Sequence, residues 1–353
     1  MFTQAVDRKD STLGVFHRWI EELSKRFEKV TVCTLRTGEI HLPENVEVVS
    51  LRPWISSDGV YIKSYWSSLR TAWRVLVEAC SRRHEYDAVF VHMNQEYLLV
   101  AGWLWVLLRK KVFFWRNHYA GNIWTDIAAF FATRVFCTSK FSYTTKYAKN
   151  KLMPVGVDVG SCNLDEEIER IPNSILFLAR FDISKRPHVL VNALEKLKKE
   201  NIPFTASFVG GVSGESSDSE QYQKDVHEAA HTAGLDPYVQ FVGAVPNTET
   251  YRYYRSHDIY VNCARSGMLD KTIFKAIACG CYALSSSGDM AEIAGEKFVY
   301  ADGDADALAT LLKEVLSRSF DERRQDVSFL QKEVVEPHRL DTLMDRLVVE
   351  MGA

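Results

Sequence analysis

The sequence predicts an α/β protein with two doubly wound domains, each built on a parallel sheet. Short apolar runs of strand length alternate with amphipathic stretches of helix length along the whole chain, which is typical of parallel strands joined by crossover helices. At 353 residues, the chain is long enough for two domains with separate cores. Hydrophobic residues at 46% and charged residues at 25% are ordinary globular usage, which argues against a disordered chain and a multi-span membrane protein.

The elements follow from these runs. In the first half, strands are predicted at 2–6, 30–35, 46–51, 88–92, 112–116 and 135–138. Helices of that half are predicted at 15–27 and 63–83. In the second half, strands are predicted at 175–179, 205–209, 239–242, 259–262, 282–285 and 298–300. Helices between them are predicted at 187–199, 219–233, 248–256, 271–279 and 305–317.

The two halves are separated by residues 158–173, which lose periodicity and gain Asp, Glu, Gly and Pro. We therefore predict a first domain over 1–160, a second over 170–335, and a C-terminal helix over 336–353 that can pack back on the first domain. Folds of this kind bind ligands at the carboxyl ends of their parallel strands, so we expect the two sheets to face each other across a binding cleft.

Cysteine usage and apolar runs predict the compartment. The seven cysteines are an odd number with no Cys-x-x-Cys pair, so we expect free thiols in a reducing cytoplasm and no zinc site. The longest apolar run, Leu98 to Leu108, is too short to span a membrane. The N-terminus lacks a basic-then-apolar pattern, so export is not expected.

Charge divides the chain. Residues 1–160 hold 22 Lys and Arg against 15 Asp and Glu, while the remainder holds 21 against 31, and all eight tryptophans lie in the first 124 residues. Within the basic half, residues 60–84 carry five cations against Glu78, with aromatic residues interleaved. An anionic membrane surface would suit this stretch, which would hold a cytoplasmic protein at the inner face of the membrane. The alternative is a helix packed on the sheet with a solvated basic edge.

Catalytic and ligand-binding residues are predicted in the loops that follow the strands of the second half. Arg180 and Lys185 precede a helix that Pro187 can open, where an Arg fork and a Lys charge are suited to a diphosphate leaving group. A solvated basic loop would have the same spacing. The next strand ends at Gly210 and Gly211, where a nucleotide can approach the backbone. Val245, in the loop FVGAVP, lies where backbone groups can meet a base edge.

The order of these motifs resembles the donor domain of retaining glycosyltransferases of family 4, which have the GT-B fold. The resemblance covers about 170–317 and includes Arg180 with Lys185, VGG, FVGAVP, Asp258, ARSGMLDKTIFKAIACG and the Glu292-Ile293-Ala294 run. It implies sugar transfer from a nucleotide-diphosphate sugar to a glycan, lipid-linked or small-molecule acceptor, without a metal or other cofactor and without a nucleic-acid partner. Arg180 and Lys185 would stabilise the departing diphosphate.

The first domain is similar to the acceptor half of that family. The resemblance implies that Gly14 lies at the donor phosphates and that His118 faces the sugar or phosphate. His92 also follows a predicted strand, although a histidine at a strand end is more often a structural hydrogen bonder.

Two departures from the family pattern concern the donor site. Family members carry two glutamates eight positions apart, and this chain has Gly267 and Lys275 there. Asp270 can replace the first as an acceptor for sugar hydroxyls, while the backbone N–H groups of Lys271 and Thr272 face the diphosphate. Lys275 offers only donors, so it cannot bind the ribose in the usual way; it can pair with a phosphate or point into solvent.

Other interpretations stay open. Loss of both glutamates fits a nucleotide-sugar-binding protein without catalysis, and a GT-B epimerase would need carboxylate acid–base residues that we cannot identify in the sequence. Asp302 and Asp304 form an Asp-x-Asp string that binds metal in another glycosyltransferase fold, but the amphipathic helix after it favours an N-cap loop.

Overall fold

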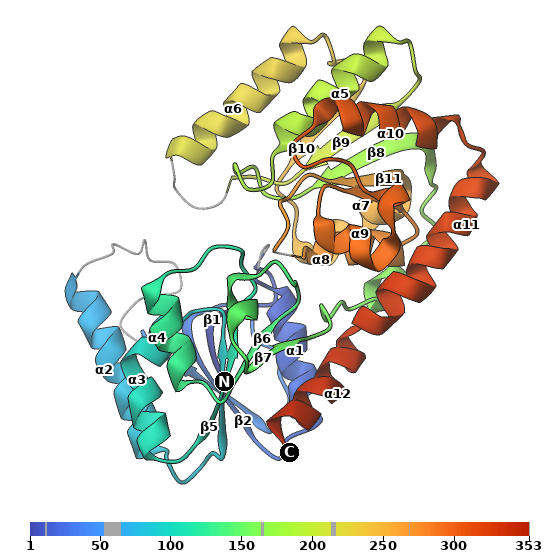
Figure 1. The fold of residues 1–353 in the computed structure, drawn as a ribbon. Coiled ribbons are helices and arrows are strands. Elements are labelled where there is room, and N and C mark those ends of the chain that lie inside the picture. Colours follow the sequence, from blue (N-terminus) through green and yellow to red (C-terminus); the bar gives the residue numbers. More distant parts are fainter. Residues whose placement is uncertain (11–12, 53–64, 164–165, 213–216, 268, 353) are drawn as a thin grey trace. The chain divides into compact units, whose positions relative to one another are not determined.

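The computed structural model describes residues 1–10, 13–52, 65–163, 166–212, 217–267 and 269–352, and the chain forms two compact units (Figure 1). Unit 1 comprises Met1–Pro154 and Leu340–Ala353, and unit 2 comprises Val155–Arg339. The first boundary predicted from the sequence lies near residues 160–170, after the observed division at Pro154 and Val155. The segment from 336 onward was predicted as a separate C-terminal helix. Unit 2 is therefore inserted into the chain of unit 1.

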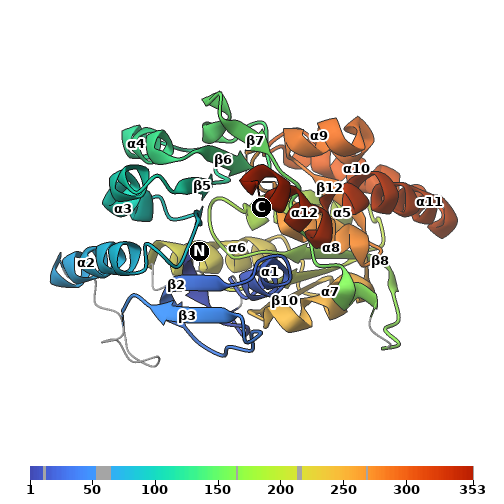
Figure 2. The ribbon, with the colours of Figure 1, turned by 90° about the horizontal axis from the view of Figure 1, so that it is seen from below.

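Unit 1 contains a parallel sheet in the order β3-β2-β1-β4-β5-β6-β7 among the described residues. Its strands are β1 (Phe2–Val6), β2 (Val30–Thr37), β3 (Val46–Ser50), β4 (Ala88–His92), β5 (Lys111–Trp115), β6 (Arg134–Cys137) and β7 (Asn150–Leu152). One face is covered by α2 (Tyr65–Ser81), α3 (Glu96–Leu107) and α4 (Ile123–Phe131), and the other by α1 (Val15–Ser24) and α12 (Leu340–Met351) (Figure 2). Helices on both faces explain why the central strands β4 and β5 bury consecutive apolar residues, Val89–Val91 and Val112–Trp115.

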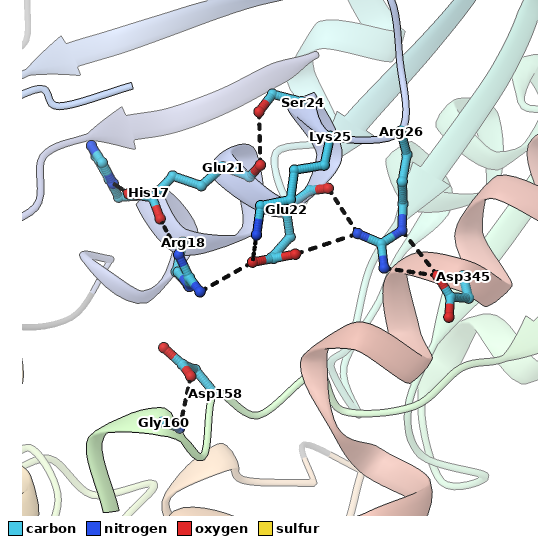
Figure 3. A network of polar contacts seen from close by, with 10 residues as sticks. All are labelled: His17, Arg18, Glu21, Glu22, Ser24, Lys25, Arg26, Asp158, Gly160 and Asp345. Carbon is cyan, nitrogen blue, oxygen red and sulfur yellow. Dashed lines mark hydrogen bonds and ion pairs between the residues drawn. The ribbon is translucent and has the colours of Figure 1, made fainter. Parts of the chain in front are cut away.

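The C-terminal helix α12 completes unit 1 through an apolar seam and a polar contact. Trp19 of α1 and Leu343 and Leu347 of α12 are fully buried in one cluster with the sheet. Beside this seam, Arg26 donates two hydrogen bonds to Asp345 of α12, at 2.7 and 3.0 Å (Figure 3). Helix α12 therefore belongs to the core of unit 1, although it follows unit 2 in the sequence.

Unit 2 contains a second parallel sheet, in the order β10-β9-β8-β11-β12. Its strands are β8 (Ile171–Leu178), β9 (Thr205–Val209), β10 (Val239–Gly243), β11 (His257–Asn262) and β12 (Tyr282–Ser285). Its helices include α5 (Pro187–Lys199), α6 (Ser217–Thr232), α7 (Thr250–Ser256), α8 (Lys271–Ala278), α9 (Gly288–Ala294), α10 (Ala305–Ser317) and α11 (Phe320–Leu330). The predicted alternation of strands and helices is confirmed in both units.

Individual elements depart from the prediction where periodicity gives no signal. The strand predicted at 298–300 is wrong: residues Glu296–Phe298 form a 3-10 turn, and only an isolated bridge joins Val299 to Ser285. Helices were expected in every gap between the strands, but α3 was given no bounds, because its sequence is apolar on all sides and has no polar stripe. Neither α3 nor any other described helix combines the length and apolarity required to cross a membrane.

The expectation that all cysteines are free is wrong for one pair. Cys162 and Cys279 form a disulfide, with their Cα atoms 4.8 Å apart. Cys162 lies in the short turn Gly160–Asn163, and Cys279 follows α8, so the fold joins residues 117 positions apart in the sequence. Local spacing cannot reveal such a pair.

The two chain segments that join unit 2 to unit 1 are bonded to each other. The backbone N–H groups of Gly156 and Val157 both donate to the carbonyl of His338, at 3.0 Å each. The Val155 N–H donates to Nδ1 of the same histidine at 3.1 Å, and Val157 bridges Arg339. Because Nδ1 accepts a hydrogen bond, the ring must be neutral to make this contact.

This contact predicts a pH-dependent stability. Burial lowers the pKa of the His338 imidazole from 6.5 to about 4. As the pH falls from 6.5 toward 4, the unfolded chain takes up a proton at this histidine that the folded chain does not, so the free energy of unfolding should decrease by up to roughly 3 kcal/mol. In His338→Asn, whose amide oxygen can accept from Val155, thermal unfolding should depend less on pH in this window. His84→Asn, at an exposed histidine, should keep the wild-type profile; identical profiles for all three proteins would contradict the assignment.

Candidate functional site

Three of the predicted donor-site residues come together at the start of α8. Asp270 is the N-cap of this helix, and its carboxylate accepts the N–H of Thr272 at 3.4 Å and forms an ion pair with Lys185. Lys185 lies in the loop after β8, and the neighbouring strand β11 ends next to α8. The side chains of Lys185 and Asp270 are only 11% and 16% exposed, so this is a largely buried charge pair.

Two residues of β11 support this pair, and the sequence analysis missed both. The Tyr260 hydroxyl donates to Thr272 Oγ1 at 2.7 Å, and Asn262 Nδ2 lies 3.5 Å from Asp270 Oδ2. Both side chains lie within the predicted strand 259–262. A polar residue at the carboxyl end of a strand was the available signal, although it does not reveal the partner.

The surroundings of Asp270 favour its charged form. Burial alone would raise the pKa of Asp270, but the adjacent Lys185 ammonium and the bonds from Thr272 hold it below its usual value. Burial also lowers the pKa of Lys271 well below its usual value. Lys185 can exchange its carboxylate partner for an anionic ligand oxygen.

Arg180 and the two glycines lie on the neighbouring loops. Arg180 pairs with Asp182 at 3.5 Å and remains partly exposed. Gly210 has φ +142°, and a Cβ there would lie 1.9 Å from the Ala179 carbonyl oxygen. A Cβ on Gly211 would lie 3.1 Å from that of Ala244. The packing of adjacent loops thus accounts for both glycines, and a close approach of a ligand to them stays a prediction.

Arg186 anchors the same loop and was also missed. It has φ +50° and is buried, and its guanidinium donates to the Cys263 carbonyl at 2.8 Å and forms an ion pair with Asp302. Asp304 accepts the N–H groups of Asp306 and Ala307 as the N-cap of α10. The N-cap interpretation of Asp302-x-Asp304 is therefore confirmed. Among the described residues, no three His, Cys, Asp or Glu side chains are placed to hold a metal ion.

Lys275 does not point into solvent. Its ammonium donates to the Thr250 hydroxyl at 3.2 Å, and burial lowers the pKa of Lys275, an effect that Asp158 opposes. Thr250 opens α7, directly after the loop that contains the partly buried Val245. Gly267 is the other position at which the family pattern has a glutamate. It has φ +93° and donates its N–H to the buried Asp289 at 3.2 Å.

Unit 1 carries the remaining predicted residues. His118 lines a cavity of about 370 Å³ together with Met93, Arg116, Asn117, Ala120, Gly121 and Asn122. Its Nδ1 lies 2.9 Å from the backbone nitrogen of Ala120 and 3.1 Å from the carbonyl oxygen of the same residue. Burial lowers the pKa of the ring, an effect that the hydrogen bond with Ala120 opposes.

Gly14 and His92 have roles inside unit 1. Gly14 is the N-cap of α1, and a Cβ there would lie 2.6 Å from the Asp10 carbonyl oxygen, so this close approach to the backbone requires a glycine. His92 is buried, lies 3.2 Å from the Thr3 hydroxyl and packs against Phe16. The structural interpretation of His92 is confirmed.

Comparison with known proteins agrees with this architecture. A family model described as "Glycosyl transferases group 1" matches residues 172–318, which include Lys185, Asp270 and Lys275. No curated protein matches the sequence.

Solved structures match over the whole chain. HepE of Anabaena in complex with UDP and glucose has a TM-score of 0.72 at 16% identity, covering 98% of each chain. A glycosyltransferase of Rickettsia africae has a TM-score of 0.71 at 16% identity, covering 99% of this chain and 97% of that one. WaaG, a glycosyltransferase involved in lipopolysaccharide biosynthesis, has a TM-score of 0.69 at 14% identity, covering 100% of both. The predicted GT-B fold is confirmed.

The buried pair predicts a large loss of stability in Asp270→Ala. This change removes the cap of α8 and leaves Lys185 buried without its carboxylate, so the free energy of unfolding should fall by about 3–5 kcal/mol. Asp304→Ala, which removes an exposed cap of α10, should cost only about 1 kcal/mol. Denaturant unfolding measures both. Adding Lys185→Met to Asp270→Ala should recover part of the loss, and equal effects of the two alanine variants would contradict a coupled buried pair.

Proposed function

We propose that this chain is a retaining glycosyltransferase that moves a sugar from a nucleotide-diphosphate sugar to an acceptor. The observation that carries the proposal is the Lys185–Asp270 pair at the start of α8, with Arg180 on the loop that contains Lys185. The family-model match over 172–318 and the description of HepE with UDP and glucose support it. A uridine diphosphate sugar is the first donor to test.

The reaction needs positive charge where the diphosphate leaves. As the bond between the anomeric carbon and the phosphate oxygen breaks, Arg180 and Lys185 neutralise the charge that develops on the diphosphate. The acceptor hydroxyl forms the new bond to the anomeric carbon, and an oxygen of the departing phosphate takes its proton. The proposal therefore requires neither a separate base nor a metal.

Positioning falls to polar groups on the two units. When Lys185 turns to the diphosphate, Asp270 is released to accept sugar hydroxyls while it continues to cap α8. On unit 1, the His118 ring and the Arg116 guanidinium border the cavity and can donate to sugar or phosphate oxygens. A glycan, a lipid-linked molecule or a small molecule can serve as acceptor.

A second candidate is a nucleotide-sugar-binding protein without catalysis. It is favoured by Gly267 and Lys275, which stand where the family carries glutamates. Incubation with a panel of nucleotide sugars and candidate acceptors separates the two functions: release of the nucleotide supports transfer, whereas binding without release supports the second candidate.

Arg180→Ala and Lys185→Ala should each lower turnover by about two orders of magnitude, because each removes one cation from the leaving diphosphate. Lys313→Ala, which removes an exposed lysine of α10 paired with Glu200, is the matched control and should retain the wild-type rate. Steady-state release of nucleotide measures turnover, and thermal unfolding shows whether each variant folds. Wild-type rates for both site variants with the true donor would reject the assigned phosphate site.

Lys275→Glu tests how the nucleotide is held. We expect the carboxylate to accept ribose hydroxyls and to tighten UDP binding about ten- to a hundredfold, corresponding to a charged hydrogen bond of roughly 1.5–3 kcal/mol. Lys275→Met, which removes the charge without supplying an acceptor, should not reproduce this gain. Calorimetry with UDP measures all three proteins. Weaker binding by the Glu variant would instead assign Lys275 to a phosphate, and unchanged affinity would show that residue 275 does not face the ligand.

A further inference from the structure

The outer surface of unit 1 carries a set of exposed large apolar side chains on three adjacent helices. We call these residues the apolar face. Each is at least half exposed to solvent. They are Trp73 on α2, Trp103, Val106 and Leu107 on α3, and Ile123, Trp124 and Phe130 on α4.

The three helices form one layer, so the apolar face is shared among neighbours. Figures 1 and 2 show α2, α3 and α4 side by side over the same face of the sheet. The contact of α3 with α4 is close: a Cβ on Gly102 would lie 2.7 Å from the side chain of Phe131. Trp105 and Ala129 point inward and are buried against the sheet, which leaves the apolar face on the opposite side of the layer.

The sequence of these helices is not that of a layer facing water. Helix α3 has Glu96 as its single charged residue, in the first turn, and α4 has only Asp126. Asp126 is already bonded, since Tyr147 donates to it and Lys146 pairs with it at 2.7 Å. A helix on the surface of a globular protein usually exposes a polar stripe, and contiguous exposed apolar patches mark interaction surfaces.

Cations lie at the ends of the helices that carry the apolar face. Arg109, two positions after the end of α3, has φ +54° and is exposed. Of its neighbours, Lys110 donates to the Tyr86 carbonyl, and Lys111 donates to the carbonyl of Met351 in α12, on the opposite face of the sheet. Beside the end of α4, Lys149 donates to the carbonyls of Phe130 and Ala132. An apolar aromatic surface with cations at its rim is complementary to an anionic lipid surface, which has negative headgroups above a hydrocarbon layer.

We propose that the apolar face of unit 1 docks on an anionic lipid bilayer. The exposed tryptophans and Phe130 enter the interfacial region, where amphipathic aromatic rings are favoured, and Arg109 and Lys149 contact the headgroups. Asn122, which lines the cavity with His118, directly precedes Ile123 and Trp124, so the face adjoins that cavity. Access to a lipid-linked acceptor would follow, and this extension alone rests on the proposed function.

This surface differs from the one expected from the sequence. Of the stretch 60–84, residues 60–64 lie outside the described residues. Within the described part, Arg74 and Arg82 both pair with Glu78, which offsets the basic charge of α2. Trp73 of that stretch remains part of the apolar face, while most of the face comes from α3 and α4.

Vesicle flotation of the whole chain, without donor or acceptor, tests the proposal. The chain should float with vesicles of phosphatidylcholine and phosphatidylglycerol, and less with phosphatidylcholine alone or in high salt. The double variant Trp103→Ser/Phe130→Ser should lower the bound fraction at least tenfold. Arg109→Glu should weaken binding to the anionic vesicles and leave binding to phosphatidylcholine vesicles unchanged. Phe320→Ser/Val349→Ser, at two exposed apolar positions outside the face, should bind as the wild type does.

Matched measurements keep the result interpretable. The substituted side chains are exposed, so thermal unfolding should be close to that of the wild type. Tryptophan emission should shift to shorter wavelength on vesicle binding, with a smaller shift in Trp103→Phe. Equal binding by the face variants, or no binding to anionic vesicles, would overturn the proposal. Light scattering gives one further outcome. If the wild type is a dimer that does not bind vesicles, and Trp103→Ser/Phe130→Ser is a monomer, the proposal is overturned and the apolar face is a self-association surface.

Discussion

The ion pair between Lys185 and Asp270 connects the loop after β8 to the first turn of α8. The local structure of unit 2 around the candidate site depends on this pair. Asp270 also caps α8, and Thr272, in the first turn of that helix, accepts a hydrogen bond from the Tyr260 hydroxyl. Charges buried to this extent are costly unless paired, so the loop and the helix are held together. Arg186, one position after Lys185, fixes the other side of the loop through Asp302 and the Cys263 carbonyl.

The same pair limits how an anionic ligand can bind. A diphosphate must draw Lys185 away from Asp270, and the released carboxylate then needs another donor. Sugar hydroxyls are suitable donors, so binding of both parts of a nucleotide sugar would satisfy both charges. A nucleotide without a sugar would satisfy only the lysine. On the proposed function, we therefore expect the site to favour the complete donor over the free nucleotide.

The alternation of strands and helices was enough to predict two doubly wound units, but not the contacts between distant residues. Asp270 was expected to accept sugar hydroxyls and Lys185 to bind phosphate, and nothing local indicates that they meet, since they lie 85 positions apart. The ends of helix α3 could not be placed, because its sequence has no polar stripe. The disulfide of Cys162 with Cys279 joins a turn to a helix end, so it depends on tertiary packing and has no local signal.

The hydrogen bonds from Val155, Gly156 and Val157 to His338 bring together the two points at which the chain enters and leaves unit 2. A domain whose ends are adjacent can be inserted into a loop of another domain without separating the flanking elements of its host. Unit 1 can therefore complete its own core with α12 even though 185 residues of unit 2 intervene. In evolutionary terms, unit 2 can be exchanged as a single segment of chain while unit 1 retains all of its own strands and helices.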